Sequence, residues 1–109
     1  MGVYIILLSD LYTVFKNTPS EIVLEFTNEN HEIFQAHFPG NPMLPGYALI
    51  DIVAKELGDN IIYIKKSKFI GHVLPNDMLT CMIKRDESKR MIKIYKEKKK
   101  ISEIIYEVK

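Results

Sequence analysis

One segment of helical length, followed only by runs of strand length, limits the folds open to this chain. Residues Tyr47 to Leu57 contain no proline or glycine, and Gly58 follows at the position of a C-terminal cap. Asp51, Lys55 and Glu56 are the only charges in this segment, which predicts a helix enclosed by other elements. The sequence therefore predicts one largely buried helix with a sheet around it.

The strands of that sheet are predicted from short runs of β-branched and aromatic residues separated by polar turns. Before the helix, a strand is expected at Glu21 to Thr27 and a shorter extended piece at His31 to Phe34. The runs after the helix are Ile61 to Ile64, Lys68 to Val73, Met78 to Lys84, Arg90 to Tyr95 and Ile101 to Val108. Apolar residues alternate in the last two runs, so one sheet face should be buried. The expected class is α+β, with one antiparallel sheet wrapped around a central helix.

Length and composition favour one domain over residues 1–109 of an ordinary globular protein. The single Cys81 cannot form an internal disulfide, which excludes a disulfide-stapled scaffold and a four-cysteine zinc module and fits a reducing cytoplasm. The longest uninterrupted apolar run, Val3 to Leu8, is too short to cross a membrane and lacks the flanks of a signal peptide. We expect it to begin a strand or helix of a cytoplasmic protein that does not act at a membrane.

The segment between the first strands and the helix carries the groups that could perform chemistry. His37 to Gly46 contains three prolines and two glycines, which predicts a stiff loop without regular structure. Gly46 opens the helix, so its N–H has no intrahelical partner and lies at the positive end of the helix dipole. Asp51 follows about a turn and a half later. A base, an oxyanion donor and an acid of this kind are the groups needed to stabilise an enolate.

The stretch Phe34-Gln-Ala-His-Phe-Pro-Gly-Asn-Pro-Met-Leu-Pro-Gly46, followed by Asp51, resembles the signature of the 3-hydroxyacyl-(acyl-carrier-protein) dehydratases. This is a hotdog-fold family of bacterial fatty-acid synthesis, and its signature fixes a histidine, three prolines, two glycines and an acid at set spacings. Lys68 to Leu79 also looks like the family's strand, turn and strand. Aspartate rather than glutamate as the acid resembles the dehydratase-isomerase branch and the short dehydratase-like proteins of aryl-polyene pathways.

The resemblance implies a hotdog fold, dimers or higher oligomers built by pairing sheet edges, and an acyl tunnel at the dimer interface. It implies His37 as the catalytic histidine, the Gly46 N–H as donor to the thioester carbonyl, and Asp51 as the catalytic acid from the partner subunit. Residues expected to contact the substrate are Phe38, Pro39, Gly40, Met43, Leu44, Pro45 and Tyr47. The implied reaction converts a 3-hydroxyacyl thioester of acyl carrier protein or coenzyme A into a trans-2-enoyl thioester, without cofactor or metal.

Two departures from the family keep other interpretations open. Ala36 and Lys55 stand where the family often has glycine and glutamine, and an ion pair between Lys55 and Asp51 would handicap a general acid. His37 could instead cap a strand or bond the loop, and Gly46 could only relieve a tight corner. The alternative functions are a hotdog thioesterase, in which Asp51 activates water, and a non-catalytic subunit that binds acyl thioesters or a carrier protein.

The charge of the chain is concentrated at one end. Residues 84–109 hold ten of the basic and five of the acidic residues, although the net charge of the whole chain is only +1. Lysines at 93, 96, 98, 99 and 100 could protect a sheet edge from aggregation or attract an acidic carrier protein. No nucleic-acid partner is expected, because a stacking platform and known binding motifs are missing. His31 and His72 lack metal-ligand spacing, and Cys81 is expected to be a buried, inert thiol.

Overall fold

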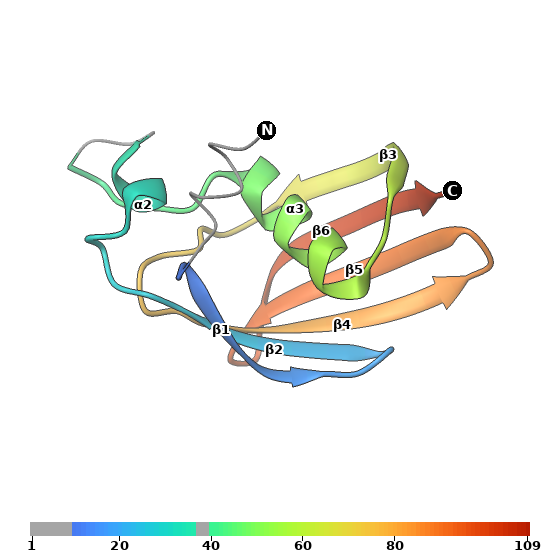
Figure 1. The fold of residues 1–109 in the computed structure, drawn as a ribbon, viewed down its shortest axis with the longest axis horizontal. Helices are drawn as coiled ribbons and strands as arrows, with labels where there is room; N and C mark the ends of the chain where they lie inside the picture. The colour runs from blue at the N-terminus through green and yellow to red at the C-terminus, as the bar shows by residue number, and fades with distance from the viewer. Residues whose placement is uncertain (1–9, 37–39) are drawn as a thin grey trace.

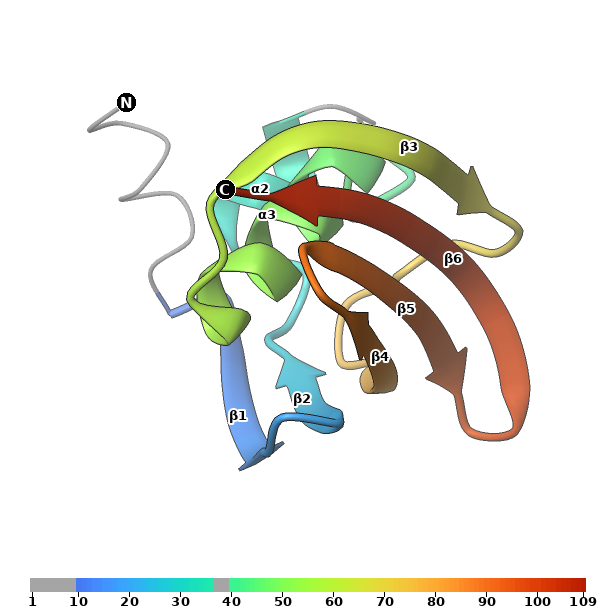
Figure 2. The ribbon, with the colours of Figure 1, turned by 90° about the vertical axis from the view of Figure 1, so that its right-hand side faces the viewer.

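The computed structural model describes residues 10–36 and 40–109 and has the predicted architecture of one antiparallel sheet around one main helix. Its elements are β1 (Tyr12–Asn17), β2 (Glu21–Phe26), α2 (Glu32–Ala36), α3 (Gly46–Leu57), β3 (Ile61–Phe69), β4 (Met78–Asp86), β5 (Lys89–Lys96) and β6 (Lys99–Val108). The six-stranded sheet has the order β1-β2-β4-β5-β6-β3 and curves around α3 (Figures 1 and 2). The strands β1 and β3 therefore form its two edges.

Helix α3 begins and ends where its local sequence requires. Pro45 is extended, with ψ 143°, and Gly58 takes the left-handed conformation of a C-terminal cap, with φ 70°. One face of the helix is buried, through Ala48, Leu49, Ile50, Ile52, Val53 and Ala54. Tyr47, Asp51 and Lys55 are exposed and lie four residues apart, so they form a single solvent-facing stripe. The expected enclosure of the helix is therefore incomplete on this side.

The core lies between α3 and the concave face of the sheet. Its strand residues include Ile22, Leu24, Phe26, Leu79, Cys81, Ile92, Ile94, Ile104 and Tyr106, and each is at most 2% exposed. Fully burying one such side chain contributes about 1.5–3 kcal/mol. The alternation predicted for the last two strands is thus confirmed, since Ile92, Ile94, Ile104 and Tyr106 all point inward.

Polar contacts fasten the C-terminal end of α3 to the sheet. The Tyr106 hydroxyl donates a hydrogen bond of 2.6 Å to Asp59, which also lies 3.4 Å from the Arg90 guanidinium. On the opposite side, the Tyr12 hydroxyl donates a 2.7 Å bond to Glu56. These bonds leave the helix anchored to both β1 and the β5–β6 pair.

Two predicted extended segments are wrong. Instead of an extended piece at His31 to Phe34, the chain forms the short helix α2, because the His31 ring accepts a bond from the Ile33 N–H and its carbonyl accepts one from Phe34. The predicted strand Lys68 to Val73 is also wrong in its bounds, because only Lys68 and Phe69 are in a strand. Residues 61–69 form one continuous β3, after which the N–H groups of Ile70 and Gly71 both bond to Ile101 and turn the chain away.

The N-terminal part of the chain contains a strand that the sequence patterns did not predict. Residues Tyr12–Asn17 form β1, an edge strand with a register shift between Val14 and Lys16, which explains its poor alternation. The run Val3 to Leu8 lies outside the described residues. No helix within 10–36 and 40–109 is long and apolar enough to span a membrane.

Candidate active site

The first turn of α3 presents an open backbone amide. Pro45 caps the helix without a side-chain hydrogen bond, and its carbonyl accepts bonds from the N–H groups of Ala48 and Leu49. Within the described parts of the chain, the N–H of Gly46 donates to no acceptor. This donor also lies at the positive end of the helix dipole, so the first turn of α3 favours an oxygen that carries negative charge.

Gly46 is required by its contact with the end of β3. A Cβ at this position would lie 2.7 Å from the Cε2 and Cζ atoms of the Phe69 ring, closer than carbon atoms approach without a shift. The ring is nevertheless 43% exposed. The ring therefore lies at the surface beside the start of α3 and forms part of the pocket wall.

A pocket of about 430 Å³ opens at this corner of the molecule. It is lined by Asn41, Met43, Leu44, Pro45, Gly46, Leu49, Phe69, Gly71, His72 and Val73. The wall on the loop side is fixed by a 2.8 Å bond from the Leu44 N–H to the Val73 carbonyl. The arrangement combines a mainly apolar cavity with one imidazole and one open amide, which suits a ligand with a hydrocarbon chain and a carbonyl oxygen.

Apart from Asp51, the predicted site residues divide into three groups. Gly46 and the predicted contact residues Met43, Leu44 and Pro45 line the pocket. Gly40 and Tyr47 do not line it; both are exposed, and Gly40 has φ 78° at a turn. His37, Phe38 and Pro39 lie outside the described residues.

Asp51 does not face the pocket of its own chain. It is exposed on the same stripe of α3 as Lys55, and no ion pair joins these two residues. The pairing weighed from the sequence is therefore not formed. Gly46 lines the pocket, whereas Asp51 is exposed and does not line it, so one chain does not place both residues at this pocket.

Six residues that line the pocket were not predicted as site residues: Asn41, Leu49, Phe69, Gly71, His72 and Val73. The last four end or follow β3 and reach the pocket only because the chain folds back over the start of α3. The sequence did offer one signal for these residues. The segment from Lys68 to Leu79 resembles a later segment of the family, but this resemblance does not say which of its side chains line the pocket.

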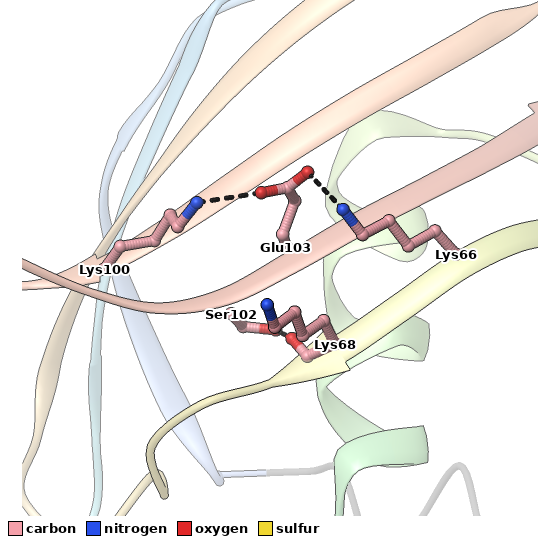
Figure 3. A network of polar contacts seen from close by, with 5 residues as sticks. All are labelled: Lys66, Lys68, Lys100, Ser102 and Glu103. Carbon is pink, nitrogen blue, oxygen red and sulfur yellow. Dashed lines mark hydrogen bonds and ion pairs between the residues drawn. The ribbon is translucent and has the colours of Figure 1, made fainter.

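Among the residues that the structure describes, charge and burial outside the pocket identify no second reactive centre. Complete burial raises the pKa of the Cys81 thiol to about 12, so this cysteine is protonated and inert, as expected. Hydrogen bonds from Lys100 and Lys66 lower the pKa of Glu103 to about 2 (Figure 3). Within residues 10–36 and 40–109 there is no cluster of three His, Cys, Asp or Glu side chains with metal-binding geometry.

A family model described as ApeI-like, ApeI dehydratase, matches residues 15–104. The chain belongs to the ApeI-like dehydratase family. The match extends over β1 to β6 and so includes the pocket, the loop before α3 and the Asp51 stripe.

Curated relatives of the chain include FabZ proteins. A bifunctional LpxC/FabZ enzyme of Chlorobaculum tepidum is 31% identical over 90 residues, covering 70% of this chain and 19% of the relative. A 3-hydroxyacyl-(acyl-carrier-protein) dehydratase FabZ of Lactiplantibacillus plantarum is 35% identical over 68 residues, covering 62% of this chain and 45% of the relative. The ApeI-like chain thus matches less than half of the length of either protein.

Solved structures place the ApeI-like chain among hotdog folds. The dehydratase heterocomplex ApeI:P from Xenorhabdus doucetiae matches with a TM-score of 0.70 and 24% identity, over 88% of this chain and 93% of that one. Thioesterase superfamily member 2 from Mus musculus matches with a TM-score of 0.66 and 13% identity, over 99% and 87%. At these identities the two structures establish the fold, which agrees with the predicted hotdog class.

Proposed function

We propose that this chain dehydrates a 3-hydroxyacyl thioester to a trans-2-enoyl thioester during the synthesis of a fatty acid or related acyl chain. The observation that carries this proposal is the open Gly46 amide beside an apolar pocket. Family membership supports the reaction type, because relatives of the chain are named as dehydratases of acyl-carrier-protein thioesters. The acyl chain would occupy the pocket, and the thioester carbonyl would bond to the amide.

In this mechanism the His37 imidazole removes a proton from C2 of the substrate. The electron pair of the broken C–H bond moves toward the thioester, whose oxygen gains negative charge and accepts a bond from the Gly46 N–H. Asp51 then donates a proton to the C3 hydroxyl, the C3–O bond breaks and water leaves. The same electron pair becomes the C2–C3 double bond. A proton passes from His37 to Asp51 through solvent and restores both groups.

This mechanism requires a second copy of the chain. Asp51 lies on the exposed stripe of α3, away from the pocket of its own subunit, so the acid must come from a partner. The neighbouring edge strand β3 is suited to join two copies, because it pairs with β6 on one side only. Its side chains Ile62, Tyr63 and Ile64 are 63%, 58% and 45% exposed. We propose a homodimer in which two β3 strands pair and each active site draws on both chains.

The test is an assay of the purified chain on a 3-hydroxybutyryl thioester, followed by the absorbance of the enoyl product. We expect turnover by the wild type, and a fall of about a hundredfold or more in kcat for both His37→Ala and Asp51→Asn. Asp86→Asn is the matched control, because it neutralises an exposed aspartate at the end of β4, far from the pocket in the sheet order. Its activity should equal that of the wild type.

The same assay separates the alternatives. A thioesterase would release free thiol without forming the enoyl product. A non-catalytic subunit would bind the thioester and produce neither, a possibility favoured by Lys55 beside the proposed acid and by the relative that forms a dehydratase heterocomplex. Full activity of His37→Ala would contradict the roles assigned here, whichever product appears.

A further inference from the structure

A second pocket lies next to the proposed acyl pocket and shares part of its wall. Its volume is about 420 Å³, and its lining residues are Gly71, His72, Leu74, Lys96, Glu97, Lys99 and Ile101. Gly71 and His72 line both pockets. The two cavities therefore meet at the segment that follows β3, but the second one is bordered by the lysine-rich turn between β5 and β6.

The contacts of this turn divide its lysines into anchored and unpaired ones. Lys96 donates a 3.0 Å bond to the His72 carbonyl and lies 2.7 Å from Asp77, so it fastens the turn to the wall shared by both pockets. Lys100 and Lys66 both point to Glu103, with ion pairs of 2.8 and 2.9 Å (Figure 3).

Lys99 differs from these anchored lysines. It lines the second pocket but forms no ion pair with any described residue. Lys98 also lacks an ion pair, yet it does not line the pocket. Lys99 and His72 are thus the lining residues that can donate to an anion and carry no ion pair, and Glu97 on the same turn is the one acidic residue among the described residues of the lining.

We propose that the second pocket binds the phosphate of a phosphopantetheine arm, with Lys99 and His72 as its donors. This inference rests on the proposed function, since an acyl thioester carried by such an arm places a hydrocarbon chain and a phosphate on one ligand. The pantetheine part between them is uncharged, so the anion must bind beside the acyl pocket rather than inside it. A neighbouring cavity with an unpaired cation meets that requirement.

Binding of turnover-free ligands tests this site separately from catalysis. Titration calorimetry compares butyryl-pantetheine with butyryl-phosphopantetheine, which differ only in the phosphate and whose saturated acyl chain can be neither dehydrated nor hydrated. We expect the phosphorylated ligand to bind about tenfold more tightly to the wild type, as for one charge-assisted hydrogen bond. Lys99→Gln should abolish most of this preference. Lys98→Gln removes the same charge from the adjacent position and should leave the preference within about twofold of the wild type.

Each outcome decides between the phosphate site and its alternatives. Equal binding of the two ligands to the wild type, or an equal loss in Lys98→Gln and Lys99→Gln, overturns the proposal. Butyryl-coenzyme A and butyryl acyl carrier protein distinguish the sources of the phosphate, and a Lys99-dependent gain with either supports the site. If the protein prefers the phosphorylated ligand but does not dehydrate the substrate, the proposed function is refuted and the phosphate site is not. Dehydration without that preference refutes only the phosphate site.

Discussion

Gly46 has two roles. Its N–H donates to no acceptor among the described residues, and its lack of a Cβ lets the Phe69 ring pack closely against the backbone. The pattern of the loop predicts the first role, because a glycine that opens a helix has an unpartnered N–H. It does not predict the second. Phe69 reaches Gly46 only through the path of β3 around the helix, and such a contact between distant positions has no local signature in the sequence.

We expect Gly46→Ala to lower the free energy of unfolding by about 1–3 kcal/mol, because the new methyl group would overlap the Phe69 ring. Urea unfolding monitored by circular dichroism measures this change. In a Phe69→Ala background the overlap is gone, and the same substitution should be neutral or stabilising by up to about 1 kcal/mol, since alanine favours helix. An equal loss in both backgrounds would show that the ring is not the cause.

Among the elements, the strands with clear turns at both ends were predictable and the edge strands were not. The turns before β4, after β4 and after β5 contain Asn76, Glu87 and Glu97, each with a positive φ, at the polar segments expected to separate the strands. By contrast, β3 was divided into two predicted strands because its middle is Lys65-Lys66-Ser67. A strand that is exposed along nearly its whole length has no buried face to impose alternation.

The exposure of β3 leads to a prediction about assembly. We expect Ile62→Lys to convert the proposed dimer into monomers, because two copies of the new charge would face each other near the paired edges. Sedimentation velocity measures the change, and activity should fall in parallel. Phe15→Lys is the matched control, since Phe15 is 60% exposed on the opposite edge strand β1.

The outcome of this pair of variants distinguishes the two edges of the sheet. If Phe15→Lys dissociates the protein while Ile62→Lys leaves it intact, then β1 joins the subunits and the proposed sharing of Asp51 is wrong. A wild-type protein that is monomeric at assay concentrations and fully active would contradict the shared site as well.

For the molecule as a whole, the burial of protonated side chains makes the free energy of unfolding fall at alkaline pH. Desolvation raises the pKa of Cys81 from 9.0 to about 12, and desolvation together with hydrogen bonds to carboxylates raises the pKa of Tyr12 and Tyr106. Each group loses its proton more readily in the unfolded chain. The stability that these groups contribute is therefore complete below their ordinary pKa values and is lost as pH rises toward the folded values.

We accordingly expect the free energy of unfolding to fall as pH rises above about 9, by up to about 1.4 kcal/mol per pH unit from Cys81 alone. Urea unfolding between about pH 7 and pH 10.5 measures the slope. Cys81→Ala should be less stable at neutral pH, because it leaves a cavity, but its stability should decline less steeply between about pH 9 and pH 10. Parallel curves for the two proteins would contradict the assigned origin of the slope.

The position of the single cysteine also gives the protein an intrinsic reporter of its own motion. Cys81 lies on an internal strand, paired with Ile22 on β2 and Ile94 on β5, and its side chain has no exposed surface. A thiol reagent can reach it only when these strands separate or the helix lifts from the sheet. The labelling rate of the unmodified protein thus measures how often the sheet opens, and its slowing by an acyl ligand would measure how firmly that ligand holds the two layers together.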